Sequence, residues 1–163
     1  MIPKERIVVY DAVCKWAQKR LLENKKFIEK LTENHIRHHH IKEFGLGYFE
    51  PGPESVQNLL SYLRIPLETL ISLFIVSVDE NNIAWSPFEH RIIFPIKDIT
   101  QATIGVGGKR IARNDFRVNY YVLPETDFNP DSFFGTEKLN EIFYELDRPL
   151  EVDNKTRKKV RKN

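Results

Sequence analysis

The spacing of hydrophobic residues changes once along the chain, near residue 75. Before that point apolar residues recur every three or four positions, as they do on one face of an α-helix. This pattern predicts helices within residues 9–21, 27–31, 36–44, 59–63 and 67–74. Gly45 and Gly47 end the third helix, and residues 49–55 contain two prolines and a glycine, which predicts a loop.

After residue 75 the apolar residues fall in short, extended runs. "FIVSVDENNIAW" predicts a hairpin, and "RIIFPI", "ATIGVGG" and "RVNYYVLPE" predict further strands. Pro95 indicates an edge strand or a bulge, and helical spacing returns over residues 139–146. We therefore expect an α+β fold, with N-terminal helices followed by a mainly antiparallel sheet. The expected domain is residues 1–146, with helices over residues 1–74 and the sheet over residues 75–146. Residues 147–163 are expected to be a flexible, basic polar tail.

The composition is that of one globular domain. The 163 residues are 41% hydrophobic and 29% charged, and no eighteen apolar residues run without a charge, which argues against a membrane span. The single cysteine, Cys14, excludes an internal disulfide framework and a multi-cysteine zinc site. We expect a reducing, cytoplasmic setting.

Charge is unevenly distributed although the net charge is only +2. Residues 91–117 hold six cations and two acids, and residues 155–162 hold six cations and no acid, which predicts a surface for a polyanion. The tail fits either a solvated extension or a nonspecific nucleic-acid arm. Strand alternation should bury one of Tyr120 and Tyr121 and leave the other able to stack on bases. The predicted nucleic-acid-binding residues are Arg91, Lys97, Lys109, Arg110, Arg113, Arg117 and Tyr120.

Three glycines, Gly105, Gly107 and Gly108, precede two cations. They match neither a Walker loop nor a dinucleotide fingerprint, because the spacing differs and no helix pattern follows. They can permit a bulge or a close backbone approach within the sheet. They can also bring backbone N–H groups, with Lys109 and Arg110, up to a phosphate. The two interpretations are compatible.

The histidines, the cysteine and the carboxylates of the sequence do not match the pattern of a known catalytic or metal-binding site. Consecutive helical histidines at 38–40 point about 100° apart and cannot all hold one ion, so a solvated or DNA-facing helix end is expected. Cys14 has no residue that would orient a base toward it and is expected to be buried or incidental. The chain has no Asp-x-Asp and no Glu-Gly pair, and Glu151-x-Asp153 lies in the polar tail. We predict no catalytic residue and no metal site.

Several segments resemble bacterial-type, DnaG-like DNA primases. "FEHRIIFPIKDITQATIGVGGKRI" is similar to the primase strand pair, with Arg91 at the arginine before the first strand and Lys109 at the cation after the paired glycines. "IKEFGLGYFEPG" upstream, and "NYYVLPET" and "FFGTEKL" downstream, resemble further primase elements in the same order. The resemblance runs from about residue 8 to residue 139.

The resemblance implies the N-terminal subdomain of the primase catalytic core, without the zinc-binding and Toprim parts. In that family this subdomain supplies a basic groove for single-stranded template, and a Toprim subdomain holds Mg²⁺ through a glutamate and aspartates. No cofactor is therefore expected in this chain, and Mg²⁺ only in a Toprim partner. The chain departs from the family at Asn119, which replaces a lysine, at Asn34, which replaces an arginine, and at Gln101, which replaces a turn glycine.

Three hypotheses follow for the function. The chain is the template-binding component of a split primase of a phage or mobile element, making RNA primers only with a separate Toprim protein. Its expected partners are single-stranded DNA or an RNA–DNA hybrid, that Toprim protein and a replicative helicase. Alternatively, it is a catalytically inactive regulator that binds nucleic acid or a replication protein. The third hypothesis is a fragment of a longer primase.

Overall fold

A computed structural model describes residues 3–112, 114–124, 126, 137–147, 150–152 and 159–161. In chain order its first elements are α1 (Lys4–Leu22), α2 (Lys25–Glu33), α3 (His38–Phe44), β1 (Gly47–Phe49), α4 (Pro53–Leu63) and α5 (Leu67–Ser72). The next elements are β2 (Ser77–Val78), β3 (Ala84–Trp85), β4 (Arg91–Lys97), β5 (Thr103–Arg110), β6 (Tyr120–Val122) and α6 (Glu137–Asp147). They are followed by β7 (Leu150–Val152) and β8 (Lys159–Arg161).

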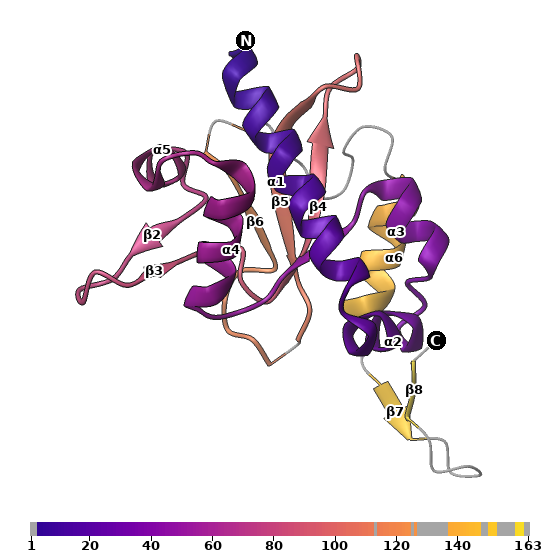
Figure 1. Ribbon diagram of the computed structural model, residues 1–163. Helices are drawn as coiled ribbons and strands as arrows, with labels where there is room; N and C mark the ends of the chain where they lie inside the picture. The colour runs from indigo at the N-terminus through magenta and orange to yellow at the C-terminus, as the bar shows by residue number, and fades with distance from the viewer. Residues whose placement is uncertain are drawn as a thin grey trace.

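The main sheet has four antiparallel strands in the order β1-β4-β5-β6. Strands β2 and β3 form a separate hairpin that projects from the body of the molecule beside α5 (Figure 1). Helix α1 crosses the main sheet, and α6 lies next to α2 and α3. The predicted α+β fold, with helices first and an antiparallel sheet after them, is confirmed.

The two faces of the main sheet pack on different helices because side chains alternate along each strand. On one face, Ile93 and Val106 belong to a buried cluster with apolar residues of α1 and α4. On the other face, Ile92 and Phe94 belong to a second cluster with apolar residues of α2, α3 and α6. Helices therefore cover both faces, and a strand residue can reach solvent only near the ends of the strands.

Local signals account for several helix boundaries. The side chain of Asn24 caps α2 by accepting a hydrogen bond from the Phe27 N–H (3.0 Å). Gly45 ends α3 in the left-handed conformation, with φ of 64°. Pro53 occupies the first turn of α4, where its missing N–H costs nothing.

The glycines of β5 serve close packing. A Cβ atom on Gly107 would overlap the ring of Phe94, and one on Gly108 would lie 2.9 Å from Cδ of Arg91. The ladder between β4 and β5 also shifts register between Ile96 and Lys97. The predicted bulge and close backbone approach are thus both confirmed.

Strand β1 is one element that the sequence did not reveal. Its three residues are all buried, so they show no alternation of apolar and polar positions, and they lie inside the segment predicted to be helical. Helix α6 confirms the helical spacing predicted over residues 139–146, within the sheet part of the chain, and it packs on the sheet. The helical and sheet segments are therefore interleaved in space.

Pro95 does not lie on an outer strand, because β4 is flanked by both β1 and β5. Strand β1 pairs only with residues Arg91, Ile92 and Ile93, so β4 has an open edge on that side at Pro95. A proline is tolerated there for the same reason as on an edge strand.

Within the predicted tail, β7 and β8 pair antiparallel, with Leu150 opposite Arg161. The sequence did not predict this pairing. Residues 153–158 and 162–163 lie outside the described residues, so the expected flexibility of the tail stays a prediction. Among the helices that the structure describes, none has the length and apolar content needed to span a bilayer.

Candidate nucleic-acid interface

Arg91 and Lys109 lie on opposite faces of the main sheet and do not line one groove. In the β4–β5 ladder Arg91 is opposite Arg110, whereas Lys109 is opposite Ile92. Since directly opposed residues share a face and neighbours alternate, Arg91 and Lys109 point in opposite directions. Both side chains are buried, with exposed fractions of 2% and 0%. That they bind nucleic acid stays a prediction.

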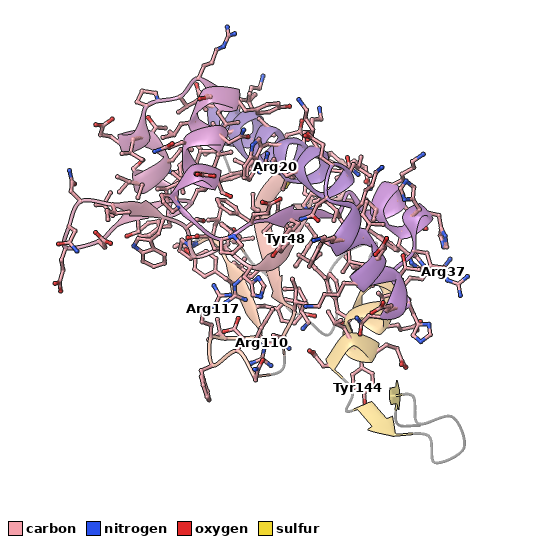
Figure 2. All side chains as sticks on the ribbon, turned by 60° about the horizontal axis from the view of Figure 1, so that its bottom comes forward. Arg20, Arg37, Tyr48, Arg110, Arg117 and Tyr144 are labelled. Atoms are coloured by element: carbon pink, nitrogen blue, oxygen red, sulfur yellow. The ribbon has the colours of Figure 1, made fainter. Side chains whose placement is uncertain are left out.

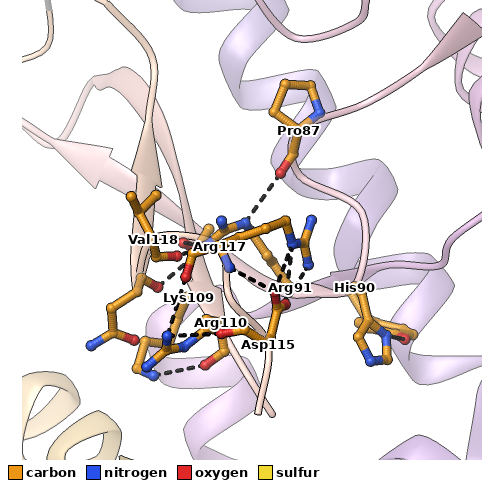
Figure 3. A network of polar contacts seen from close by, with 11 residues as sticks. Pro87, His90, Arg91, Lys109, Arg110, Asp115, Arg117 and Val118 are labelled. Atoms are coloured by element: carbon orange, nitrogen blue, oxygen red, sulfur yellow. Dashed lines mark hydrogen bonds and ion pairs between the residues drawn. The ribbon is translucent and has the colours of Figure 1, made fainter. Parts of the chain in front are cut away.

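The guanidinium of Arg91 is bonded to backbone carbonyls. Its Nη1 donates to Val118 (2.9 Å), Asn119 (3.2 Å) and Gly108 (3.3 Å), and its Nε donates to Pro87 (3.1 Å). Burial, with a further contribution from Arg117, lowers its pKa to about 10, so it remains charged at neutral pH. Arg91 thus ties the chain after β5 to the chain before β4 (Figure 3).

Lys109 is held by the end of helix α6. Its ammonium lies 2.6 Å from a carboxylate oxygen of Asp147 and donates to the carbonyl of Arg110 (2.7 Å). Asn119 donates to the other oxygen of Asp147 (3.1 Å). Burial lowers the pKa of Lys109, and the hydrogen bond to Asp147 opposes that shift. The ammonium of Lys109 is thus already paired with a carboxylate of this chain.

The segment between β5 and β6 is braced by two further arginines (Figure 3). Arg110 donates through Nη1 to the carbonyls of Asp115 (3.0 Å) and Arg117 (3.1 Å). The Asp115 carboxylate accepts from the Arg117 backbone N–H (3.0 Å) and from its guanidinium (2.8 Å at the shortest). We call residues 114–119 the braced loop.

Cations gather at the end of the sheet where this loop lies. Figure 2 shows Arg110 and Arg117 close together, and Figure 3 shows His90, the residue before β4, on the other side of Arg91 from them. The pKa of His90 is lowered by burial and by the charges of Lys30 and Arg117, which are therefore both near it. We call Lys30, Arg110 and Arg117, together with His90, which a lowered pKa leaves largely uncharged at neutral pH, the cationic strip.

The strip is connected to the core through Tyr48. The hydroxyl of Tyr48 lies 2.9 Å from Nδ1 of His90, and the ring of Tyr48 stacks on that of Phe27, with ring centroids 3.8 Å apart. Phe27 and Lys30 belong to the same helix, α2, which explains how Lys30 comes near a residue about sixty positions later in the chain. Burial raises the pKa of Tyr48 to about 12.

The remaining predicted residues lie elsewhere. Lys97 is opposite Thr103 at the far end of the β4–β5 ladder, roughly 20 Å from Arg91 at about 3.3 Å per residue. Tyr120 packs between Phe94 and Phe143, while Tyr121 packs on Phe88. Both tyrosines are half-buried against core residues because helices cover both faces of the sheet, so the expected division into one buried and one free ring is not observed. Arg113 lies outside the described residues.

Lys30 and His90 belong to the cationic strip and Phe116 lies in the braced loop beside Arg117, and the sequence singled out none of the three. Lys30 lies on a helix that is far along the sequence from the basic segment. His90 directly precedes Arg91, whose charge drew the prediction to that position instead. Phe116 is an apolar residue next to Arg117 within the basic segment. That position in the sequence was the only indication that it could take part in binding.

Cys14 and the histidines are placed as expected. Cys14 is buried, and burial raises the pKa of its thiol, which makes it unreactive. His38 and His39 are exposed at the start of α3. His40 caps that helix, since its Nδ1 accepts from the N–H of Arg37 (2.9 Å).

A groove of about 770 Å³ lies between the sheet and α6. Its lining includes Asn34 and Asn119 on one side and Glu141, Glu145 and Asp147 of α6 on the other. These carboxylates would repel a phosphate backbone. We therefore place the candidate interface on the cationic strip and not in this groove.

Replacing Asp115 by asparagine should loosen the braced loop. The hydrogen bonds from Arg117 hold the pKa of the Asp115 carboxyl far below the usual value of about 3.9. Between the lowered pKa of Asp115 in the folded protein and its usual pKa in the unfolded chain, the unfolded chain binds more protons. The stabilisation that the Asp115–Arg117 contact gives the folded protein is therefore complete above about pH 5 and is lost as pH falls below about 4. We expect D115N to lower the free energy of unfolding by about 1 kcal/mol at pH 7. Urea titrations should show a smaller difference from wild type at pH 3, and an equal difference at both pH values would contradict this assignment.

Solved structures place this fold among primase catalytic cores. The Aquifex aeolicus primase structure of zinc-binding and RNA polymerase domains is 26% identical, with a TM-score of 0.62 over 78% of this chain and 31% of that chain. The DnaG primase catalytic domain solved with single-stranded DNA has the same fold, with a TM-score of 0.61 and 24% identity over 83% of this chain and 44% of that one.

The family model described as the DNA primase catalytic core, N-terminal domain, matches residues 16–135. The chain belongs to this family. The DNA primase of Campylobacter jejuni is 29% identical over 111 residues, which are 68% of this chain and 18% of that protein. The chain thus spans less than a fifth of this curated relative.

Proposed function

We propose that this chain binds single-stranded template within a DnaG-like primase assembly, and that a separate Toprim protein completes the active site. The assembly would make RNA primers for DNA replication. The observation that carries the proposal is the cationic strip, which lies at one end of a sheet in a chain of the primase core family.

Three properties of the strip support nucleic-acid binding. It combines side chains from α2, from the residue before β4, from the end of β5 and from the loop after β5, so it extends across several elements, as a strand of nucleic acid would. The arginines of its loop are held by hydrogen bonds, which reduces the entropy lost on binding. In the solved primase domain with single-stranded DNA, a protein of the same fold holds that ligand.

Among the residues that the structure describes, none form a cluster that would fit a magnesium ion. Within the described ranges, no three His, Cys, Asp or Glu side chains gather where they could hold a metal ion. We therefore derive no metal-dependent step from this chain and propose that the carboxylates for Mg²⁺ come from the Toprim partner. An RNA–DNA hybrid and a replicative helicase are further partners of the proposed assembly.

Reconstitution tests this proposal. The chain should be mixed with a Toprim protein encoded beside it, single-stranded template, Mg²⁺ and ribonucleotides, and labelled RNA resolved on a gel. Short RNA should form only when both proteins and Mg²⁺ are present. A mixture that makes no RNA, from proteins that do not co-purify, would contradict the split-primase arrangement.

A second candidate function is that of an inactive regulator that binds nucleic acid or a replication protein. The specific observation in its favour is the Lys109–Asp147 ion pair, because Lys109 lies where the resemblance puts the cation after the paired glycines and Asp147 neutralises its charge. Asn119, which replaces the family lysine, is also bonded to Asp147. This function predicts binding of single-stranded DNA without primer synthesis in any mixture.

A further inference from the structure

Phe116 is a fully exposed aromatic side chain within the braced loop. Single exposed apolar residues are common on protein surfaces and by themselves indicate nothing. Phe116 differs because the residues on both sides of it are fixed: Asp115 and Arg117 are bonded to each other and both accept from Arg110. The ring is therefore presented on a backbone that is already held in place.

The brace extends to the far end of the loop. Arg91 donates to the carbonyls of Val118 and Asn119, so two arginine side chains from adjacent strands hold the loop. Apolar burial does not explain this arrangement, because Phe116 and Val118 both face solvent. The hydrogen bonds hold an aromatic ring outward, at the edge of the cationic strip.

The charge around Phe116 distinguishes it from Trp85, another of the exposed aromatic side chains. Arg91, Arg110 and Arg117 surround one carboxylate, Asp115, so the loop keeps an excess of positive charge. Trp85, on the β2–β3 hairpin, is 43% exposed, but the hairpin turn carries Asp79 and Glu80. Phosphate would be attracted to the first surface and repelled by the second.

We infer that Phe116 is a stacking platform for a base of single-stranded nucleic acid whose phosphates lie on the cationic strip. The inference rests on the proposed function and adds the residue that contacts a base. A phenyl ring offers a π-face to any base, so the contact tolerates sequence, as template binding requires. The nearby arginines supply the phosphate contacts that bring a strand to the ring.

The test uses the full chain and a short single-stranded DNA that contains 2-aminopurine, whose fluorescence is quenched on stacking. Wild type should quench it, and F116A should both abolish quenching and weaken binding by at least about tenfold. F116W should retain affinity within about threefold. W85A is the matched control, and it should bind like wild type.

The slope of log affinity against log salt separates stacking from charge. Since F116A removes no charge, its slope should equal that of wild type. Unchanged affinity or unchanged quenching in F116A, with wild type binding the DNA, would overturn the stacking role and would indicate a protein-facing Phe116. If wild type itself does not bind the DNA, the proposed function fails together with the stacking role.

Discussion

Replacing Gly47 by alanine should destabilise the protein by about 3 kcal/mol. Gly47 lies in β1 opposite Ile93, where α1 crosses the sheet. A Cβ atom there would lie 2.6 Å from the backbone nitrogen of Gln18 and closer still to the carbonyl carbon of Ala17. Because these atoms are main chain, no rotamer change relieves the overlap, and α1 must move away from the sheet. The free energy of unfolding from urea titration measures the effect.

Two variants separate the clash with α1 from the general effect of replacing a strand glycine by alanine. G105A makes the same change in the same sheet, but its new methyl group would meet only the side chain of Thr126, which can rotate. We expect G105A to cost less than about 1.5 kcal/mol. The double variant A17G/G47A should not recover stability, because the clash with the α1 backbone remains. A G47A protein within about 1 kcal/mol of wild type would contradict the close packing of β1 on α1.

The second large effect is expected in nucleic-acid binding. The variant K30E/R117Q removes two cations of the cationic strip, one on α2 and one in the braced loop, and should weaken binding to single-stranded DNA by about tenfold to hundredfold at low salt. Fluorescence anisotropy with labelled DNA measures this change. Glutamine at 117 keeps a donor for Asp115, which limits the disturbance of the braced loop.

K97E is the matched control for this variant. Lys97 is an exposed cation of the same basic segment, but it lies at the opposite end of the β4–β5 ladder. We expect K97E to change affinity by less than about threefold. An effect of K97E as large as that of K30E/R117Q would show that net charge, and not the strip, determines binding.

The fold class could be predicted because most elements carry their own signal. The helical spacing of Val13, Ala17 and Leu21 marks α1, and the glycine at 45 marks the end of α3. Strand β1 was missed because its three residues are buried on both sides and so lack period-two alternation. A strand that short becomes recognisable only through its partner, β4.

The site could be predicted only to a limited extent, because sequence shows which residues are basic and not where their side chains point. The register that puts Arg91 opposite Arg110 decides that Arg91 and Lys109 lie on different faces, and no local pattern fixes that register. Lys30 joins the interface through the contact of Phe27 with Tyr48, which links positions far apart in the chain. Such contacts arise only on folding.

The salt dependence of binding to single-stranded DNA shows directly whether the cationic strip holds a template strand. With about three phosphate contacts on the cationic strip, log affinity should fall linearly with log salt, with a slope of about −2. K30E/R117Q should make that slope shallower by about 1, whereas F116A should leave it unchanged. Absence of binding at low salt, or an affinity that does not depend on salt, would contradict the assignment of this chain as a template-binding primase subunit.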